Sequence, residues 1–124
     1  MSNCKINEIN VNGINYVPKD SINSPAIPLN GMKYVICRTY SAGVFSGYLE
    51  GRNGQEVVMR KARRLWYWSG AASLSQLAME GVKDPDNCKF PCEVDRVELL
   101  NAIEILDCTE IAKNSIQGVS TWEK

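Results

Sequence analysis

The chain of 124 residues contains no histidine. Histidine is the usual general base near neutral pH and the commonest metal ligand, so its absence narrows the chemistry. A hydrolase that pairs a Ser or Cys nucleophile with His is excluded. Cys88 and Cys92 are separated by three residues, and no second pair accompanies them. We therefore expect no zinc site and no other metal centre.

Long apolar runs, a secretory signal pattern and an excess of one charge are also missing. No stretch approaches the ~18 apolar residues of a membrane span, so we expect no membrane association. The cysteines are odd in number, which favours free thiols in a reducing cytoplasm. The formal net charge is zero, and this argues against a general DNA-binding protein.

The charges are nevertheless unevenly distributed along the chain. Residues 1–79 hold nine Lys or Arg against four Asp or Glu, whereas residues 80–124 hold ten acidic residues against five basic ones. Two interpretations are open. The two parts pair within one fold or across an oligomer, or the first part contains a local basic site for an anion.

The N-terminal region, residues 1–30, has the pattern of an appendage. Apolar and polar residues alternate on both sides of Asn12-Gly13, a dipeptide that favours a tight hairpin turn. We expect a β-hairpin of about 5–11 and 14–17. Residues 18–31 contain three prolines and several turn formers, so we expect a linker there. The main domain then spans residues 31–124.

The first part of the main domain has a strand pattern. Residues 32–40, 44–49 and 56–61 are rich in β-branched and aromatic residues, and short turn-forming segments, including residues 51–54, separate them. Consecutive strands with short connections form a β-meander. The third strand continues or kinks into residues 63–68.

Two helices are expected, each with a capping residue. Ser73 precedes a short amphipathic segment over 74–80 that ends at Gly81, and Thr109 precedes a second over 110–116. Residues 93–106 fit either two strands, which we favour, or one helix. Residues 119–122 form a closing strand or a tail. The predicted class is α+β, with a mostly antiparallel β-sheet of five to seven strands, two short helices and the N-terminal β-hairpin.

The most chemically concentrated stretch is residues 62–81, ARRLWYWSGAASLSQLAMEG. Arg side chains suit phosphate oxygens, and Trp and Tyr rings stack on nucleobases. If residues 63–68 form a strand, Arg64, Trp66 and Trp68 share one face. The alternative is that the tryptophans belong to the core and the arginines are solvated or paired with acidic residues.

No catalytic constellation is apparent. The carboxylates of residues 84–104 are not fixed in a pair, and a solvated face explains them. The small-residue turns at 41–43 and 69–73 lack the spacing and the lysine of a phosphate-binding loop. We expect a binding protein that is not an enzyme and has no cofactor.

The stretch from Met32 to Gly81, followed by KFPCEVDRVELLNAIEILDCTE, resembles a family of small phage proteins. Its most specific segment is ARRLWYWSGAASLSQLA. The resemblance is to the first type of Thoeris anti-defence sponge proteins and related phage proteins. It implies a viral protein of the host cytoplasm that binds a cyclic ADP-ribose isomer made by bacterial TIR-domain enzymes and does not degrade it. It also implies binding of other small cyclic oligonucleotide signals by some members, and self-association as a dimer or higher homo-oligomer.

For the ligand that the resemblance implies, side-chain chemistry assigns roles to eight residues. Cations would hold the pyrophosphate, indoles would stack on adenine, and polar side chains would bond ribose or phosphate oxygens. The assignments are, in that order, Arg38, Arg63 and Arg64; Trp66 and Trp68; and Ser73 and Gln76, with Arg96 as an outlying candidate from the partner side of a shared pocket. The alternative function is a small phage protein that binds a host protein through a Trp/Arg-rich surface.

Overall fold

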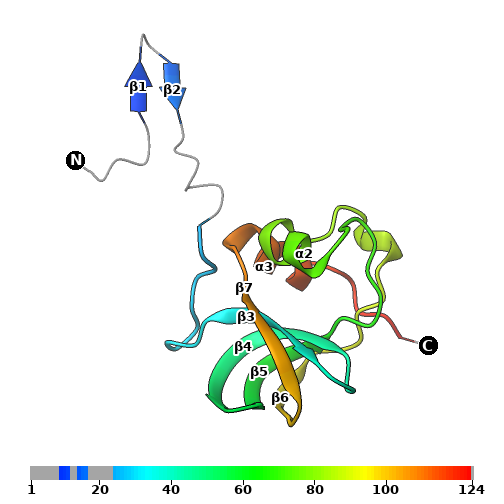
Figure 1. Cartoon of the computed structure of the whole chain (residues 1–124). Coiled ribbons are helices and arrows are strands. Elements are labelled where there is room, and N and C mark those ends of the chain that lie inside the picture. Colours follow the sequence, from blue (N-terminus) through cyan, green and yellow to red (C-terminus); the bar gives the residue numbers. More distant parts are fainter. Residues whose placement is uncertain (1–8, 12–13, 17–23, 124) are drawn as a thin grey trace.

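The computed structural model describes residues 9–11, 14–16 and 24–123. Two strands, β1 (Ile9–Val11) and β2 (Ile14–Tyr16), pair antiparallel with each other as a separate two-stranded sheet (Figure 1). This confirms the predicted hairpin within the described residues, whereas residues 5–8 and 17 lie outside them. The described part of the expected linker, residues 24–31, is attached to the main domain, because Ala26 is buried and its N–H donates to the Cys108 carbonyl.

The main domain contains a five-stranded antiparallel sheet in the order β6-β5-β4-β3-β7. Its strands alternate apolar residues toward a core. They are β3 (Tyr34–Thr39), β4 (Val44–Asn53), β5 (Glu56–Arg64), β6 (Val94–Leu99) and β7 (Ala102–Asp107). The α+β class, the meander and the two-strand interpretation of residues 93–106 are confirmed.

Two details of the strands differ from the sequence predictions. The turn expected over residues 51–54 is shifted toward the C-terminus, because β4 continues through Asn53, which pairs with Glu56 across a turn at Gly54 and Gln55. A register shift between Leu49 and Gly51 allows the strand to continue past the glycine. The third strand ends at Arg64, so residues 65–68 do not continue its alternation of faces.

The sheet curls into a barrel-like shape. Strands β6 and β7 occupy opposite edges in the strand order, yet only Leu100 and Asn101 join them. A connection this short requires the two edges to meet, and the Ala102 N–H donates to the Gln55 carbonyl there. Figure 1 shows β7 crossing in front of the other strands toward β6.

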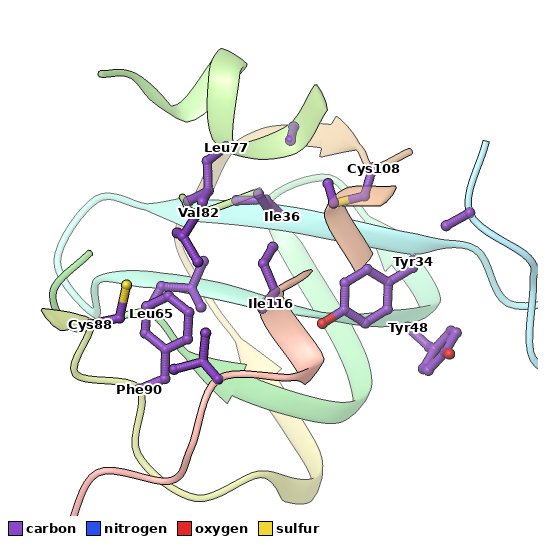
Figure 2. Packing of buried hydrophobic residues seen from close by; sticks show 14 residues of the cluster. Tyr34, Ile36, Tyr48, Leu65, Leu77, Val82, Cys88, Phe90, Cys108 and Ile116 are labelled. Atoms are coloured by element: carbon purple, nitrogen blue, oxygen red, sulfur yellow. The ribbon is translucent and has the colours of Figure 1, made fainter. Parts of the chain in front are cut away.

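Each face of the sheet has its own core. Inside the curl, Val35 and Cys37 pack with Phe45, Val57 and Met59. On the outer face, Tyr34 and Ile36 pack beneath two helices, α2 (Leu74–Glu80) and α3 (Glu110–Gln117), as Figures 1 and 2 show. β3 is therefore buried on both faces, which explains its continuous apolar run.

Both predicted helices are confirmed with their caps. The Gln76 N–H donates to Ser73 Oγ at 3.1 Å, and Gly81 ends α2 with a φ of 78°. The Ala112 N–H donates to Thr109 Oγ1 at 3.0 Å at the start of α3. The loop after α2 contains a 3₁₀ turn at Pro85–Asn87, and residues 119–122 form only an isolated bridge between Phe90 and Thr121.

Gly47 allows β4 and β5 to lie close together. A Cβ at this position would lie 2.9 Å from the Ala62 Cα and 3.0 Å from the Arg60 carbonyl oxygen. We predict that Gly47→Ala lowers the free energy of unfolding by about 1–3 kcal/mol in urea denaturation, because backbone atoms cannot move aside. Gly51→Ala in the same strand meets nothing within 4 Å and is the matched control. Equal stabilities of the two variants would contradict this account.

Glu110 fastens residues 24–29 to α3. Its Oε1 accepts from the Ile27 N–H at 2.7 Å, and this bond, with Lys113 and Asn114, holds the Glu110 pKa below its usual value. A lowered pKa in the folded state contributes stability that is lost as pH falls from about 4.5 through the folded pKa. Glu110→Gln should therefore weaken the decline in thermal stability below that pH. Glu56→Gln, a charge-matched control, should leave the decline as it is.

Candidate functional site

Four side chains form an exposed aromatic–lysine patch: Trp66, Tyr67, Lys89 and Trp122. The Trp66 and Trp122 rings stack with centroids 4.9 Å apart and an angle of 24° between their planes. The Lys89 Nζ lies 5.7 Å from both indole centroids and 6.0 Å from the Tyr67 centroid. Trp66 and Tyr67 are 59% and 52% exposed. The patch thus presents planar rings and a cation together on the surface.

Three segments that are distant in sequence build this patch. After β5 ends, Leu65 enters the core and leaves its neighbours Trp66 and Tyr67 outside. Tyr67 and Lys89 exchange backbone hydrogen bonds, with N···O distances of 3.3 Å and 2.7 Å. The Trp122 N–H donates to the carbonyl of buried Phe90 at 2.9 Å. The patch is therefore attached to the core through Leu65 and Phe90.

A cavity of about 500 Å³ adjoins the patch. This volume is within the ~300–1,000 Å³ typical of small-molecule sites. Polar groups in its wall are ordered, since Ser69 Oγ and Asn87 Nδ2 both donate to Asp84 Oδ2, at 3.0 Å and 2.8 Å. The lining residues are Tyr67, Ser69, Asp86, Asn87, Cys88, Lys89 and Trp122.

The predicted arginines are dispersed over the domain. Arg63 is buried and donates to three backbone carbonyls, whereas the Arg64 guanidinium carbon lies 4.6 Å from the centroid of the Phe45 ring. Arg38 on β3 pairs with Glu104 at 2.8 Å. Arg96 on β6 pairs with Glu98 at 2.9 Å and with Glu50 at 3.4 Å. The structure does not bring Arg38 and Arg96 together with the stretch around Trp66.

Ion pairs link the basic first part of the chain to its acidic second part. Lys33 pairs with Asp107, and Arg38 pairs with Glu104. Arg60, on the neighbouring strand, donates to Glu50 at 2.6 Å, and this bond is the main cause of the lowered Glu50 pKa. Two ion pairs thus join bases of the first part to acids of the second within one chain, whereas the Arg60–Glu50 pair lies within the first part.

The other predicted residues contribute to local structure. Trp68 is half-buried and packs against the outer core. Ser73 caps α2, while the Gln76 side chain accepts from the Ala72 N–H at 2.8 Å and donates to Glu80 at 3.3 Å. Of the eight residues, Trp66 belongs to the patch, and Arg64 precedes it in sequence by two positions.

Sequence reasoning did not include Tyr67, Lys89 and Trp122 among the site residues. Trp122 sits in a tail with little secondary-structure pattern, and Lys89 lies in a proline-punctuated loop. The available clue was the tryptophan itself, a large aromatic residue near the end of the sequence whose burial against other rings is favourable.

The described cysteines are free thiols. Cys92 is exposed, and Cys37, Cys88 and Cys108 are buried. Burial raises the pKa of the Cys108 thiol to about 12, so this group stays protonated near neutral pH. Across residues 9–11, 14–16 and 24–123, no three His, Cys, Asp or Glu side chains gather where they could hold a metal ion.

Comparison with known proteins places the chain in one family. The family model described as Domain of unknown function (DUF6948) matches residues 32–116, which is more than half of the chain. The chain therefore belongs to this family, and the matched region contains β3 to β7 and both helices except the last residue of α3. No curated protein and no solved structure matches the chain.

The hydrogen bond between the Gln76 N–H and Ser73 Oγ should stabilise the start of α2. Ser73→Ala removes the acceptor of the Gln76 N–H and should lower the free energy of unfolding by about 1 kcal/mol in chemical denaturation. The control is Ser75→Ala, in the exposed interior of the same helix, where alanine is the better helix former. A Ser73→Ala protein as stable as the Ser75→Ala protein would show that the cap contributes little.

Proposed function

We propose that this protein is a viral anti-defence protein that binds and sequesters a nucleotide-type immune signal. The ligand is a cyclic ADP-ribose isomer made by bacterial TIR-domain enzymes, and other small cyclic oligonucleotides are further candidates. The protein holds the ligand without degrading it and so blocks antiphage signalling in the host cytoplasm. The observation that carries the proposal is the stacked Trp66–Trp122 pair with Lys89 beside a cavity of about 500 Å³. The resemblance of the segment ARRLWYWSGAASLSQLA to the Thoeris sponge family indicates the ligand class.

The patch supplies the two interactions that such a ligand needs. A purine base can stack on an exposed indole or phenol face, and each such stack is worth about 1–3 kcal/mol. The Lys89 ammonium is a cation for phosphate oxygens. Ser69 and Asn87 in the cavity wall offer hydroxyl and amide groups to a ribose. Arg64, two residues before Trp66, is exposed, and its guanidinium lies over the Phe45 ring.

Sequestration requires tight binding rather than chemistry. At nanomolar affinity, about −12 kcal/mol, a modest molar excess of protein depletes a signalling molecule. Self-association into a homo-oligomer would cover part of the exposed aromatic surface and enclose a bound ligand further. Among the described residues, no helix is both long enough and apolar enough to cross a membrane.

A second candidate is a phage protein that binds a host protein. Trp66 and Tyr67 are more than half exposed, and exposed aromatic residues with neighbouring cations are typical of interface hot spots. The two candidates differ in their ligand, so a direct binding experiment separates them.

The experiment is a capture assay with the product of a signalling TIR enzyme. The product is mixed with the protein, the free fraction is removed by filtration, and the retained protein is heated. Sequestration predicts a depleted filtrate and release of the unchanged product on heating, detected by chromatography. Free passage of the product contradicts the proposal, and release of an altered product indicates an enzyme.

Trp66→Ala tests where the ligand binds. We expect its affinity for the captured product to fall at least tenfold in isothermal titration, which corresponds to about 1.4 kcal/mol. Tyr40→Ala is the control, because Tyr40 is 81% exposed at the β3–β4 turn and does not line the cavity beside the patch. Unchanged affinity of Trp66→Ala, with capture intact, would remove the patch from the binding site while leaving sequestration possible elsewhere.

A further inference from the structure

Arg63 is a buried cation held by neutral partners. Its side chain is on β5, and the residue is only 6% exposed. Nε donates to the Pro91 carbonyl at 3.1 Å, Nη1 to Ile116 at 3.0 Å and Nη2 to Phe90 at 3.2 Å. The guanidinium carbon also lies 5.4 Å from the Phe90 ring centroid. These contacts fix the plane of the guanidinium group.

None of these partners carries a full negative charge. The ion pairs within 4.0 Å that the described residues form do not include Arg63. Carbonyl oxygens, including that of Ile116 at the C-terminal end of α3, offset only part of the cost of burying a cation. Desolvation accordingly lowers the Arg63 pKa.

A small cavity opens beside this guanidinium group. The Arg63 cavity has a volume of about 180 Å³. Its lining residues are Tyr34, Arg63, Glu93, Gln117, Val119 and Thr121. The volume is below the ~300 Å³ at which sites for drug-sized ligands begin, so it suits an ion or one terminal group of a larger molecule.

The lining offers hydrogen-bond donors to an anion. A guanidinium group has five N–H donors, and three of them are used by the carbonyls, which leaves two. The Tyr34 hydroxyl lies 3.1 Å from Ser46 Oγ, and Figure 2 shows it turned toward Ile116. Two hydroxyls can exchange donor and acceptor roles, so Tyr34 can donate to an anion while accepting from Ser46. The Gln117 amide and the Thr121 hydroxyl are exposed at the entrance.

We propose that the Arg63 cavity binds a small tetrahedral oxyanion of the phosphate class, with the Arg63 guanidinium as its counter-ion. Phosphate oxygens match the fork of donors that arginine presents. Free phosphate and the terminal phosphoryl group of a larger molecule share this chemistry. The inference does not rest on the proposed function, because it derives from the burial, partners and cavity of Arg63 alone.

The Arg63 cavity and the aromatic–lysine patch share a wall. The Phe90 carbonyl accepts from both Arg63 Nη2 and the backbone N–H of Trp122. Thr121 lines the Arg63 cavity, whereas its neighbour Trp122 lines the cavity beside the patch. The two sites are therefore separate but adjacent.

Glu93 provides a test with the opposite sign. Its carboxylate lines the Arg63 cavity and is like-charged to an incoming anion, so Glu93→Gln should strengthen phosphate binding several-fold. Gln117→Leu replaces the amide donor with an apolar side chain of similar size and should weaken phosphate binding several-fold. Both residues are exposed, so these variants keep the three structural hydrogen bonds of Arg63 intact.

The experiment is isothermal titration of the full chain with inorganic phosphate at constant ionic strength, repeated with pyrophosphate and adenosine monophosphate. Saturable phosphate binding that is tighter in Glu93→Gln, weaker in Gln117→Leu and unchanged in Arg52→Ala, an exposed arginine that lines neither this cavity nor the one beside the patch, supports the site. Binding of the nucleotide but not of free phosphate, with the same order of variants, assigns the site to a phosphoryl group of a larger ligand.

Two results would overturn the inference. If none of the three anions binds in a saturable way, the site does not exist, and a loss of stability in Glu93→Gln would then identify Glu93 as the counter-ion of Arg63. If Lys89→Ala abolishes binding while the cavity variants do not alter it, the anion binds at the patch instead. Capture of the TIR-enzyme product is a separate measurement, so failure here leaves the proposed function to its own test.

Discussion

The hydrogen bonds from the Arg63 guanidinium to the carbonyls of Phe90, Pro91 and Ile116 connect three segments of the domain. They tie the end of β5 to the loop after α2 and to the last turn of α3. The loop after α2 has little regular pairing of its own, so a charged donor group that satisfies two of its carbonyls and one of α3 connects it to the sheet. The same loop is also held by the backbone hydrogen bonds between Tyr67 and Lys89 and by the buried Phe90 side chain.

Both proposed sites depend on that connection. The backbone of Phe90 supports Trp122, which stacks on Trp66, and Lys89 lies next to Phe90 in the chain. The same segment separates the aromatic–lysine patch from the Arg63 cavity. An arginine that sequence reasoning assigned to a ligand thus has a structural role, and it also lines the neighbouring small cavity. The exposed arginines Arg38 and Arg96 are instead paired with carboxylates on their own or adjacent strands.

Most of the fold was predictable because its signals are local. Caps at Ser73 and Thr109, the glycine after α2 and the strand-forming residues of β3 to β7 are all signals that operate over a few residues. The predicted turn between β4 and β5 is misplaced because glycine occurs both in turns and at strand irregularities. By composition Gly51 indicates a turn, yet it lies within a long, irregular strand. The site was less predictable, since only Trp66 of the eight proposed residues lies in the patch.

By itself, the sequence determined the helices and strands, their order along the chain, and the concentration of arginine and aromatic residues around Arg63 and Trp66. Only the tertiary structure decided which of those side chains face solvent. β5 ends at Arg64, and this turns Arg63 inward and leaves Trp66 outside. The partners that give each residue its role, Trp122 for Trp66 and Ile116 for Arg63, lie more than fifty positions away. Such contacts follow from how the packed layers meet, which no local pattern specifies.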